Sequence, residues 1–363
     1  MGAGPARAER GPDLLSHAYG TLTGVADQAV ADGAGVKLFV DAWDPAYGSA
    51  IEAAEAEPTG ESSAQVRPEV ECDPAAWAPV TPAPGRTLPG TVLLVDGVRR
   101  VDAHIFVEES DGTVHTGLAA SYAAGVVRCD LRRGSAAVAG ARVVRGFFTS
   151  SLDAADIVTG NARYQVHRVA SMELAQIKQA IQARLRALEI EVSSLARATT
   201  ETLGPDYAAD DDLLVLDGPL TGRDQLPRAL GYVKTHRVQY LPPELSSVVS
   251  RLGPGQRTPV FLLGTSWHRY TWYLRLPGGG GAPWAGVVRV ECSADLAKSE
   301  AIALADLATL TLPRFASHPY KDPRAPQNLT PIAGLERKLR GMLGDQRLLL
   351  RGLTAATARH RAA

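Results

Sequence analysis

The chain has 363 residues, enough for one large domain or two smaller ones. Its 38 Lys and Arg residues and 39 Asp and Glu residues leave a formal net charge of −1. This balance excludes a uniformly basic nucleic-acid-binding surface, although it permits a local basic groove. Hydrophobic residues make up 45% of the chain, so a large apolar core is expected and wholesale disorder is excluded.

The cysteines and the hydropathy pattern indicate the compartment. Cys72, Cys129 and Cys292 lie far apart and form no Cys-x-x-Cys pair, so we expect neither a structural zinc site nor a disulfide framework. The N-terminal residues lack the continuous apolar stretch of a signal peptide, and no apolar run approaches the ~18 residues of a membrane span. We therefore expect a cytoplasmic protein with no membrane association.

The composition predicts three regions along the chain. Residues 1–87 are expected to be helical and irregular, with an excursion rich in Pro, Glu and Ala that ends near residue 85 and cannot order by itself. Trp77 is a candidate anchor of this excursion to the rest of the protein. Residues 88–345 are expected to form the main domain, and residues 346–363 a C-terminal helical tail.

The main domain is predicted to begin with three strands. Residues 91–98 are a largely apolar run closed by Asp-Gly, which is typical of a strand buried on both faces. Residues 99–110 alternate more and lead into Asp111–Gly112, a strong hairpin signal. Residues 114–130 follow as the next strand. Together these segments predict a three-stranded antiparallel meander.

A long helix is predicted over residues 172–198, although its start is open and reaches back to Asn161 in the alternative reading. Five apolar residues share one face of this helix at helical spacing: Ile177, Ile181, Leu185, Leu188 and Val192. Strand and helix signals then alternate from residue 212 to the end of the chain. A meander followed by a helix and then by alternating elements predicts an α/β fold, a ribonuclease H-like mixed sheet with flanking helices.

Two carboxylates have equivalent places in this pattern. Asp96 in LLVDG and Asp217 in LVLDG each follow an apolar strand, and ligands of open α/β sheets bind outside the carboxyl ends of the strands. Two adjacent carboxylates repel each other unless a cation lies between them, and hard divalent cations take oxygen ligands. The pattern therefore suggests a metal site for phosphoryl transfer, while ordinary Asp-Gly turn chemistry is the alternative.

Glu173 is a candidate third acid, because it precedes the apolar stripe of the long helix. If the helix begins near residue 172, Glu173 is a first-turn acid that the helix dipole favours. If the helix begins near Asn161, Glu173 is a mid-helix acid for which that explanation fails. The sequence leaves both readings open.

The order of five short motifs resembles that of the NurA nuclease family: VDG (95–97), SMELA (171–175), LDGPL (216–220), VKTH (233–236) and PRAPQNLTPIAGLE (323–336). The resemblance covers about residues 88–345 and implies a ribonuclease H-like fold. It also implies a DNA nuclease that depends on Mn²⁺ (or Mg²⁺) and acts as a 5′–3′ exonuclease and single-strand endonuclease. By the same resemblance, the protein is a homodimer that processes DNA ends with a HerA-type hexameric ATPase, in repair or in antiphage defence.

The resemblance also assigns roles to residues. It makes Asp96, Glu173 and Asp217 the acidic metal ligands and Lys234 a catalytic basic partner near the phosphate. Val98 departs from the family, which usually has Ser at this position. Archaeal members carry a late Tyr and His, for which His318 and Tyr320 are present here, and Asn328 is the alternative at the position of the His. The candidate DNA-binding residues are Arg99, Arg100, His318, Tyr320, Arg324 and Asn328.

Two functions of different classes follow from these residues. The first is a nuclease that hydrolyses phosphodiesters by in-line attack of a water activated at the metal site. The alternative is a non-catalytic ribonuclease H-like partner that binds the ATPase ring and guides DNA. Val98 favours the alternative, whereas the presence of all three acids favours the enzyme.

Overall fold

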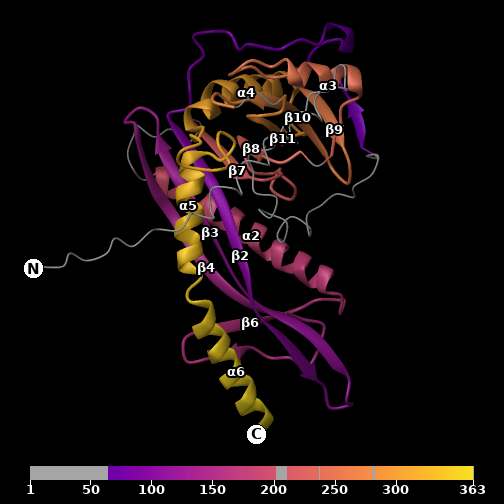
Figure 1. Ribbon diagram of the computed structural model, residues 1–363, viewed down its shortest axis with the longest axis vertical. Helices are drawn as coiled ribbons and strands as arrows, with labels where there is room; N and C mark the ends of the chain where they lie inside the picture. Colours follow the sequence, from indigo (N-terminus) through magenta and orange to yellow (C-terminus); the bar gives the residue numbers. More distant parts are fainter. Residues whose placement is uncertain (1–63, 202–210, 237, 280–282, 363) are drawn as a thin grey trace, which may run out of the picture. The chain divides into compact units, whose positions relative to one another are not determined.

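The computed structural model describes residues 64–201, 211–236, 238–279 and 283–362. All of them belong to the second of the two units into which the chain divides, Ala42–Ala363. The described residues form a mixed α/β fold, in which an 11-stranded sheet is flanked by helices (Figure 1). Within these residues, no helix combines the length and the apolar character needed to cross a bilayer.

Strand β2 (Thr91–Glu108) is central to the sheet because its neighbours change along its length. Residues 91–95 pair in parallel with β7 (Asp212–Asp217), while nearly the whole strand pairs antiparallel with β3 (Val114–Asp130). β3 pairs in turn with β4 (Ser135–Thr149). Beyond residue 95, β2 therefore continues into a long hairpin that β7 does not accompany.

The structure corrects two predictions about the meander. The strands predicted at 91–98 and 99–110 are one continuous strand, since Asp96 and Gly97 stay paired with β3 instead of forming a turn. The third strand of the meander is β4, which we did not predict because its sequence is rich in Ala, Gly and Arg and lacks a regular apolar alternation. The turn at Asp111–Gly112 is confirmed, and Gly112 adopts a positive φ of 83° there.

The remaining strands extend the sheet in both directions. β8 (Ala229–Val233) lies parallel to β7. Four strands follow β8 in antiparallel order: β11 (Val287–Ser293), β10 (His268–Arg275), β9 (Phe261–Gly264) and β1 (Gln65–Arg67). Two strands lie beyond β4: β6 (Arg163–Arg168) and β5 (Ile157–Val158). The complete order is β1-β9-β10-β11-β8-β7-β2-β3-β4-β6-β5.

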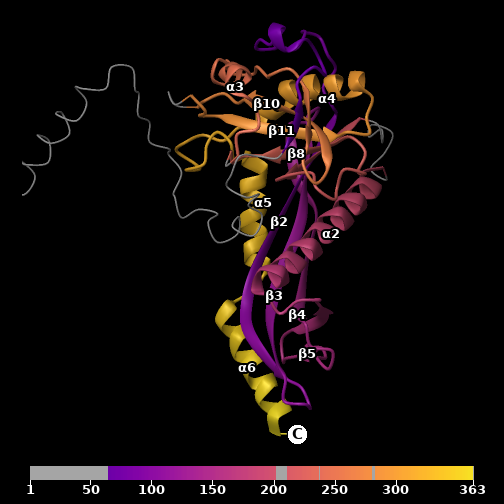
Figure 2. The ribbon, with the colours of Figure 1, turned by 90° about the vertical axis from the view of Figure 1, so that its right-hand side faces the viewer.

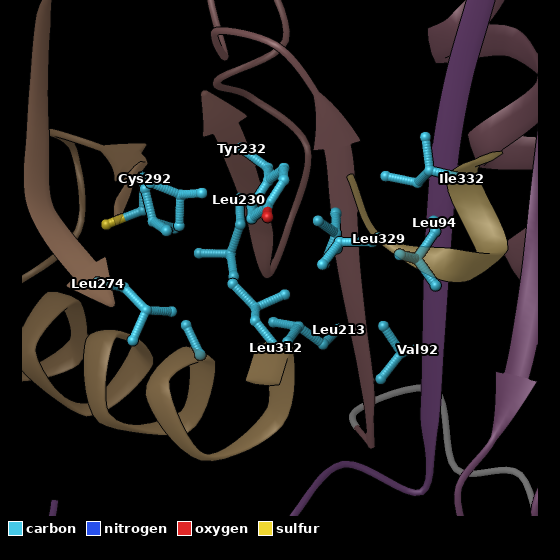
Figure 3. Close-up of a cluster of buried hydrophobic side chains, with 14 of the residues drawn as sticks. Val92, Leu94, Leu213, Leu230, Tyr232, Leu274, Cys292, Leu312, Leu329 and Ile332 are labelled. Atoms are coloured by element: carbon cyan, nitrogen blue, oxygen red, sulfur yellow. The ribbon is translucent and has the colours of Figure 1, made fainter. Parts of the chain in front are cut away.

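Helices cover both faces of the central strands. α2 (Leu174–Glu201) lies on one side of β2, β3 and β4, and α5 (Thr330–Met342) lies on the other (Figure 2). The predicted apolar stripe of α2 is confirmed, because all five of its residues are buried against the sheet. On the opposite face, α4 (Lys298–Thr311) and α5 cover a second apolar cluster, in which Leu329 and Ile332 lie near Leu94 (Figure 3).

The pleat of β2 decides which side of the sheet its residues face. Leu93 and Val95 belong to the cluster under α2, whereas Val92 and Leu94 belong to the cluster under α4 and α5. Side chains of a strand alternate between the two faces, so the side chain of Asp96 is directed to the α5 side.

The C-terminal region is helical, as predicted, and is divided into two helices. α5 is followed by α6 (Gln346–Ala362), and Gly344 between them has a φ of 81°. α6 continues past α5 and packs on the far part of β2 and on β5 (Figure 1). Another helix of the described residues, α3 (Pro243–Ser250), lies in the part of the chain where strand and helix signals were predicted to alternate.

The described part of the predicted N-terminal excursion, from residue 64, packs on the sheet. β1 pairs with β9, and the Trp77 ring is buried 5.8 Å from the ring of Phe261. The buried Arg257 donates to both carboxylate oxygens of Glu71, at 2.7 and 2.9 Å. Residues 1–63 and part of the glycine run at 278–281 lie outside the described residues.

Candidate functional site

Asp96 and Asp217 lie side by side where β2 and β7 part. Val95 pairs with Leu216, so the two acids are the next residues on neighbouring parallel strands, which run about 4.8 Å apart. Asp96 is 9% exposed, and the side chain of Asp217 is 16% exposed. The sheet therefore brings these two candidate ligands together in a largely buried place.

This pair has the electrostatics of an anionic site. Burial and the charge of Asp217 raise the pKa of Asp96 well above its usual range, and Lys234 offsets this rise only in part. Asp96 Oδ1 accepts a hydrogen bond of 2.7 Å from the amide of Gly97. Asp217 Oδ1 is buried and accepts no hydrogen bond from any described residue. Two buried carboxylates in this arrangement favour the uptake of a proton or a cation.

Lys234 supplies positive charge to one side of the pair. It lies one residue beyond the end of β8, and its side chain is 14% exposed. Its Nζ donates to Asp217 Oδ2 at 2.6 Å and to Asn328 Oδ1 at 3.1 Å. The ammonium group therefore binds one oxygen of Asp217 and leaves the other oxygen without a donor from the described residues.

The loop before α5 continues this chain of polar contacts. Asn328 is completely buried, and its Nδ2 donates to Asp322 Oδ2 at 2.5 Å. Asp322 Oδ1 accepts from the amide of Arg324 at 2.8 Å, and Arg324 Nη2 donates to Glu336 Oε2 of α5 at 3.1 Å. A continuous series of hydrogen bonds thus joins Asp217 to α5.

Glu336 is an acid of α5 that acts on Asp96 through its charge. Burial raises the pKa of Glu336, but hydrogen bonds and the positive charge of Arg340 and Arg324 outweigh burial and lower the pKa overall. The carboxylate of Glu336 also contributes to the raised pKa of Asp96. Glu336 is therefore part of the electrostatic surroundings of the carboxylate pair, held by two arginines.

Glu189 approaches the same place from α2, on the other side of the sheet. It is 5% exposed and forms an ion pair with the buried Arg223, which also donates to the carbonyl of Pro219. A Cβ atom on Gly97 would lie 2.5 Å from Glu189 Oε1, so the glycine is what permits this approach. The charge of Glu189 also raises the pKa of Asp96.

We did not single out Glu189 from the sequence, although it has a signal there. It follows Leu188 and lies four residues after Leu185, so it is a charged residue within the buried stripe of a helix. A buried charge needs a partner or a function, so this placement makes Glu189 a candidate.

Glu173 lies elsewhere. It immediately precedes α2, is exposed, and its carbonyl oxygen accepts the amide of Ile177 at 3.1 Å. The helix therefore begins near residue 172, as in the first of the two readings, and β6 occupies part of the segment that the second reading made helical. Glu189 is sixteen residues further along the chain, about 24 Å at 1.5 Å per residue. The structure does not bring Glu173 to Asp96 and Asp217.

Three of the candidate DNA-binding residues are engaged within the protein. Arg100 donates to the carbonyls of Gly344 and Leu343 and forms an ion pair with the buried Asp102. Arg324 is bonded to Asp322 and Glu336, and the side chain of Asn328 is inaccessible to solvent. These side chains bond the loop before α5 and the end of α5, and their expected contact with DNA stays a prediction.

Of the other three candidates, His318 and Tyr320 are exposed. Arg99 is half-buried on β2, three residues after Asp96. The rings of His318 and Tyr320 are stacked with centroids 5.7 Å apart. Lys321 Nζ lies 5.3 Å from the centre of the Tyr320 ring. These aromatic and basic groups belong to the loop that carries Asp322 and Asn328, and exposed rings of this kind can stack on bases.

The side chains present at this site decide whether it can hold the expected divalent cation. The described part of the chain contains no group of three or more His, Cys, Asp and Glu side chains arranged to hold a metal ion. The pair of Asp96 and Asp217 nevertheless fits a divalent cation, because Mg²⁺ is commonly held by one or two carboxylates and completes its coordination with water and substrate phosphate. The unbonded Asp217 Oδ1 and the raised pKa of Asp96 agree with this fit.

The chain was compared with protein-family models and with curated proteins. No protein-family model matches the chain, and no curated protein matches it significantly. The function is therefore inferred from the geometry of the carboxylate pair and its surroundings, together with the order of the motifs in the sequence.

Proposed function

We propose that this protein is a metal-dependent DNA nuclease of the NurA type with a ribonuclease H-like fold. The pairing of Asp96 and Asp217 where two parallel strands part, with Lys234 bonded to one of them, carries this proposal. The strand order β4-β3-β2-β7-β8 supports the fold, because a meander joined through a helix to two parallel strands is the arrangement expected for it.

Asp96 and Asp217 would hold the metal, and Glu189, which lies on the α2 side of the sheet and is paired with Arg223, would act on the site through its charge. A bound Mn²⁺ or Mg²⁺ would offset charge on the phosphate oxygens and lower the pKa of a nearby water. The ion pair of Glu189 with Arg223 also fixes the carbonyl of Pro219, two residues after Asp217. Glu189 therefore acts both on the electrostatics of the site and on the position of the loop that follows β7.

The chain's own cations would bind the substrate. Lys234 lies beside Asp217, and its ammonium group is a suitable donor to a non-bridging phosphate oxygen. Arg99, His318, Tyr320 and Lys321 would contact the strand further from the reacting phosphate. In this proposal the DNA is bound by a few local groups, in agreement with a net charge of −1.

The alternative is a non-catalytic body that guides DNA for the ATPase. One observation favours it, because the carboxylate of Glu189 is already paired with Arg223 and only two carboxylates remain for a metal. Cleavage of labelled oligonucleotides and plasmid with Mn²⁺, compared with EDTA, discriminates the two functions. A wild-type protein that leaves both substrates intact with and without the ATPase supports the guide.

Four variants test the site within the same assay. Asp96→Asn and Asp217→Asn are each expected to lower cleavage by at least ~100-fold, as loss of charge stabilisation at a reacting phosphate does. Glu189→Gln is expected to be impaired, because it weakens the ion pair with Arg223 that holds the loop after β7, while the control Glu173→Gln, at an exposed position just before the same helix, stays within about twofold of wild type. An inactive Glu173→Gln beside an active Glu189→Gln would restore Glu173 as the third ligand.

We also propose a homodimer and a HerA-type ATPase as partner, both on the resemblance of the motifs. The exposed Leu348 and Leu350 of α6 support a partner surface, since α6 presents them to solvent beside exposed arginines. Light scattering at micromolar concentration tests the dimer, and co-purification with the co-expressed ATPase tests the complex. A monomeric mass in the first measurement contradicts the dimer.

A further inference from the structure

We propose that Asp322 and Asn328 form a positioning pair that aims the ammonium group of Lys234 at a phosphodiester oxygen. The pair does not touch the substrate and acts through Lys234. The inference rests on the proposed nuclease function for the identity of the substrate, and on the hydrogen bonds of the loop before α5 for the positioning itself.

The first step is the orientation of the Asn328 amide. Its Nδ2 donates to Asp322 Oδ2 at 2.5 Å, and an ionised carboxylate only accepts hydrogen bonds. Asp322 therefore fixes the amide with its NH₂ group turned away from Lys234. The other end of the amide, Oδ1, is then directed to the ammonium group at 3.1 Å. Without Asp322, the Asn328 amide would be able to rotate and direct its NH₂ group towards the ammonium group of Lys234, which is itself a donor.

The second step concerns Asp322, which is itself held in place. It is 8% exposed, and its Oδ1 accepts the amide of Arg324 at 2.8 Å. The side chain of Arg324 in turn donates to Glu336 of α5. The carboxylate of Asp322 is therefore connected to α5 through Arg324. A charged group in such a place is costly unless it is well bonded, so a residue retained only for packing would be apolar.

The third step is the direction of Lys234. An ammonium group has three donors. Asp217 Oδ2 and Asn328 Oδ1 take two of them, and no described residue accepts the third. The side chain is 14% exposed, so a phosphate oxygen can reach it. A lysine has a flexible four-carbon stem, and fixing its head before the substrate binds reduces the entropy lost in the reaction.

The positioning is measured without metal, DNA or activity. The chain has six lysines, at positions 37, 178, 234, 298, 321 and 338, so ¹⁵N-lysine labelling of the full-length protein gives few ammonium signals. We expect a slowly exchanging ammonium signal from Lys234, assigned by its loss in Lys234→Arg. Asn328→Ala should remove this signal. Ser317→Ala, which changes a buried hydroxyl of the same loop that bonds no described residue, should leave it intact.

A double-mutant cycle tests the consequence for catalysis. We expect Asn328→Ala to lower kcat for Mn²⁺-dependent cleavage about 10-fold in the wild-type background, and to have no further effect in a Lys234→Ala background. A double variant that exchanges the two side chains, Asp322→Asn with Asn328→Asp, keeps the volume of both. It should recover both the signal and most of the rate, because the carboxylate moved to position 328 would accept from Lys234 and from the amide moved to position 322.

The outcomes separate the positioning from the nuclease function. A Lys234 signal that survives Asn328→Ala overturns the positioning pair, even if the protein cuts DNA. Equal effects of Asn328→Ala with and without Lys234 also overturn it, because they indicate a structural role. If the wild type does not cut DNA but the signal is lost in Asn328→Ala and kept in Ser317→Ala and in the exchange variant, the nuclease function falls and the positioning of Lys234 stands.

Discussion

Asp96 shows how a single side chain links the site to the stability of the protein. Burial and Asp217 raise its pKa, so the folded state holds the proton of this carboxyl more tightly than the unfolded state does. The folded state therefore gains stability from this group below the ordinary carboxyl pKa of about 4. That stability is lost as the pH rises through the raised pKa, where the charged form faces Asp217.

The first prediction follows from this linkage. Asp96→Asn removes the charge and should raise the free energy of unfolding at pH 7.5 in EDTA by on the order of 1–3 kcal/mol, since each pKa unit corresponds to about 1.4 kcal/mol. The gain should shrink towards zero near pH 4. Urea unfolding at a series of pH values measures it, with the exposed Asp295→Asn as control. A gain that is independent of pH would contradict this account.

The second prediction concerns Gly97. A methyl group there would lie 2.5 Å from Glu189 Oε1 and 2.8 Å from Leu185 Cδ1, so Gly97→Ala should destabilise the protein by about 1–3 kcal/mol. Gly140→Ala on β4 is the matched control, because no atom of the described residues lies within 4 Å of its added Cβ. Thermal unfolding of both variants compares them. Equal melting temperatures of the two variants would contradict this prediction, because they would show that Glu189 can move away from the added methyl group without loss of stability.

At this scale the sequence predicts acids that follow strands better than acids on helices. Asp96 and Asp217 were singled out because each follows an apolar run, although the Asp-Gly pattern ends β7 and lies inside β2. Glu173 was singled out and Glu189 was not considered, because motif order indicates a segment, whereas the distance along α2 decides which acid of that segment reaches the sheet. The contacts of Asp322 and Asn328 depend on a loop path that no periodicity encodes.

At the scale of elements, Arg100, a candidate DNA-binding residue, forms hydrogen bonds at the C-terminal end of α5. Arg100 donates to the carbonyls of Gly344 and Leu343 at 2.9 and 3.4 Å, and Arg145 also donates to Leu343. The last carbonyls of a helix lack partners within the helix, so these bonds stabilise its C-terminus. They also attach α5 to the strands of the long hairpin.

The third prediction tests this attachment. Arg100→Ala leaves the buried carboxylate of Asp102 without its ion pair, and should lower the free energy of unfolding by about 2–3 kcal/mol. Arg142→Ala is the control, since Arg142 and its partner Glu191 are both more than half exposed and such a pair contributes at most about 1 kcal/mol. Urea unfolding measures both. A similar loss in the two variants would refute a specific role of Arg100.

The elements that the sequence predicts well have strong local patterns. The stripe of α2 and the turn at Asp111–Gly112 are confirmed, because helical spacing and a two-residue turn are local features. β4 was missed, and β2 was divided in two, because an Asp-Gly pair inside a strand has the same local pattern as a turn. The pairing of Asp96 and Gly97 with Gly125 and Ala124 of β3, the other strand of the hairpin, keeps them extended.

At the scale of the whole molecule, the charge balance limits how DNA can be bound. A net charge of −1 leaves only local groups for the phosphates, and several arginines near the site are engaged in ion pairs. Fluorescence anisotropy with single-stranded DNA should give a slope of log K against log salt between about −1.5 and −3, at about −0.7 for each phosphate contact. A slope near zero would exclude a DNA groove, and one steeper than about −5 would require a broad basic surface.

The change of neighbours along β2 also has a consequence for the order of folding. Glu108 pairs with Val114 across a short turn, whereas Val95 pairs with Leu216, which lies far along the chain. Contacts between residues close in sequence form fast, whereas contacts between distant residues require the closure of a long loop. The β2–β3 hairpin should therefore form before β7 pairs with β2. Asp96 and Asp217 then come together only in a late step of folding. Their repulsion therefore opposes the docking of β7 and does not oppose the formation of the β2–β3 hairpin.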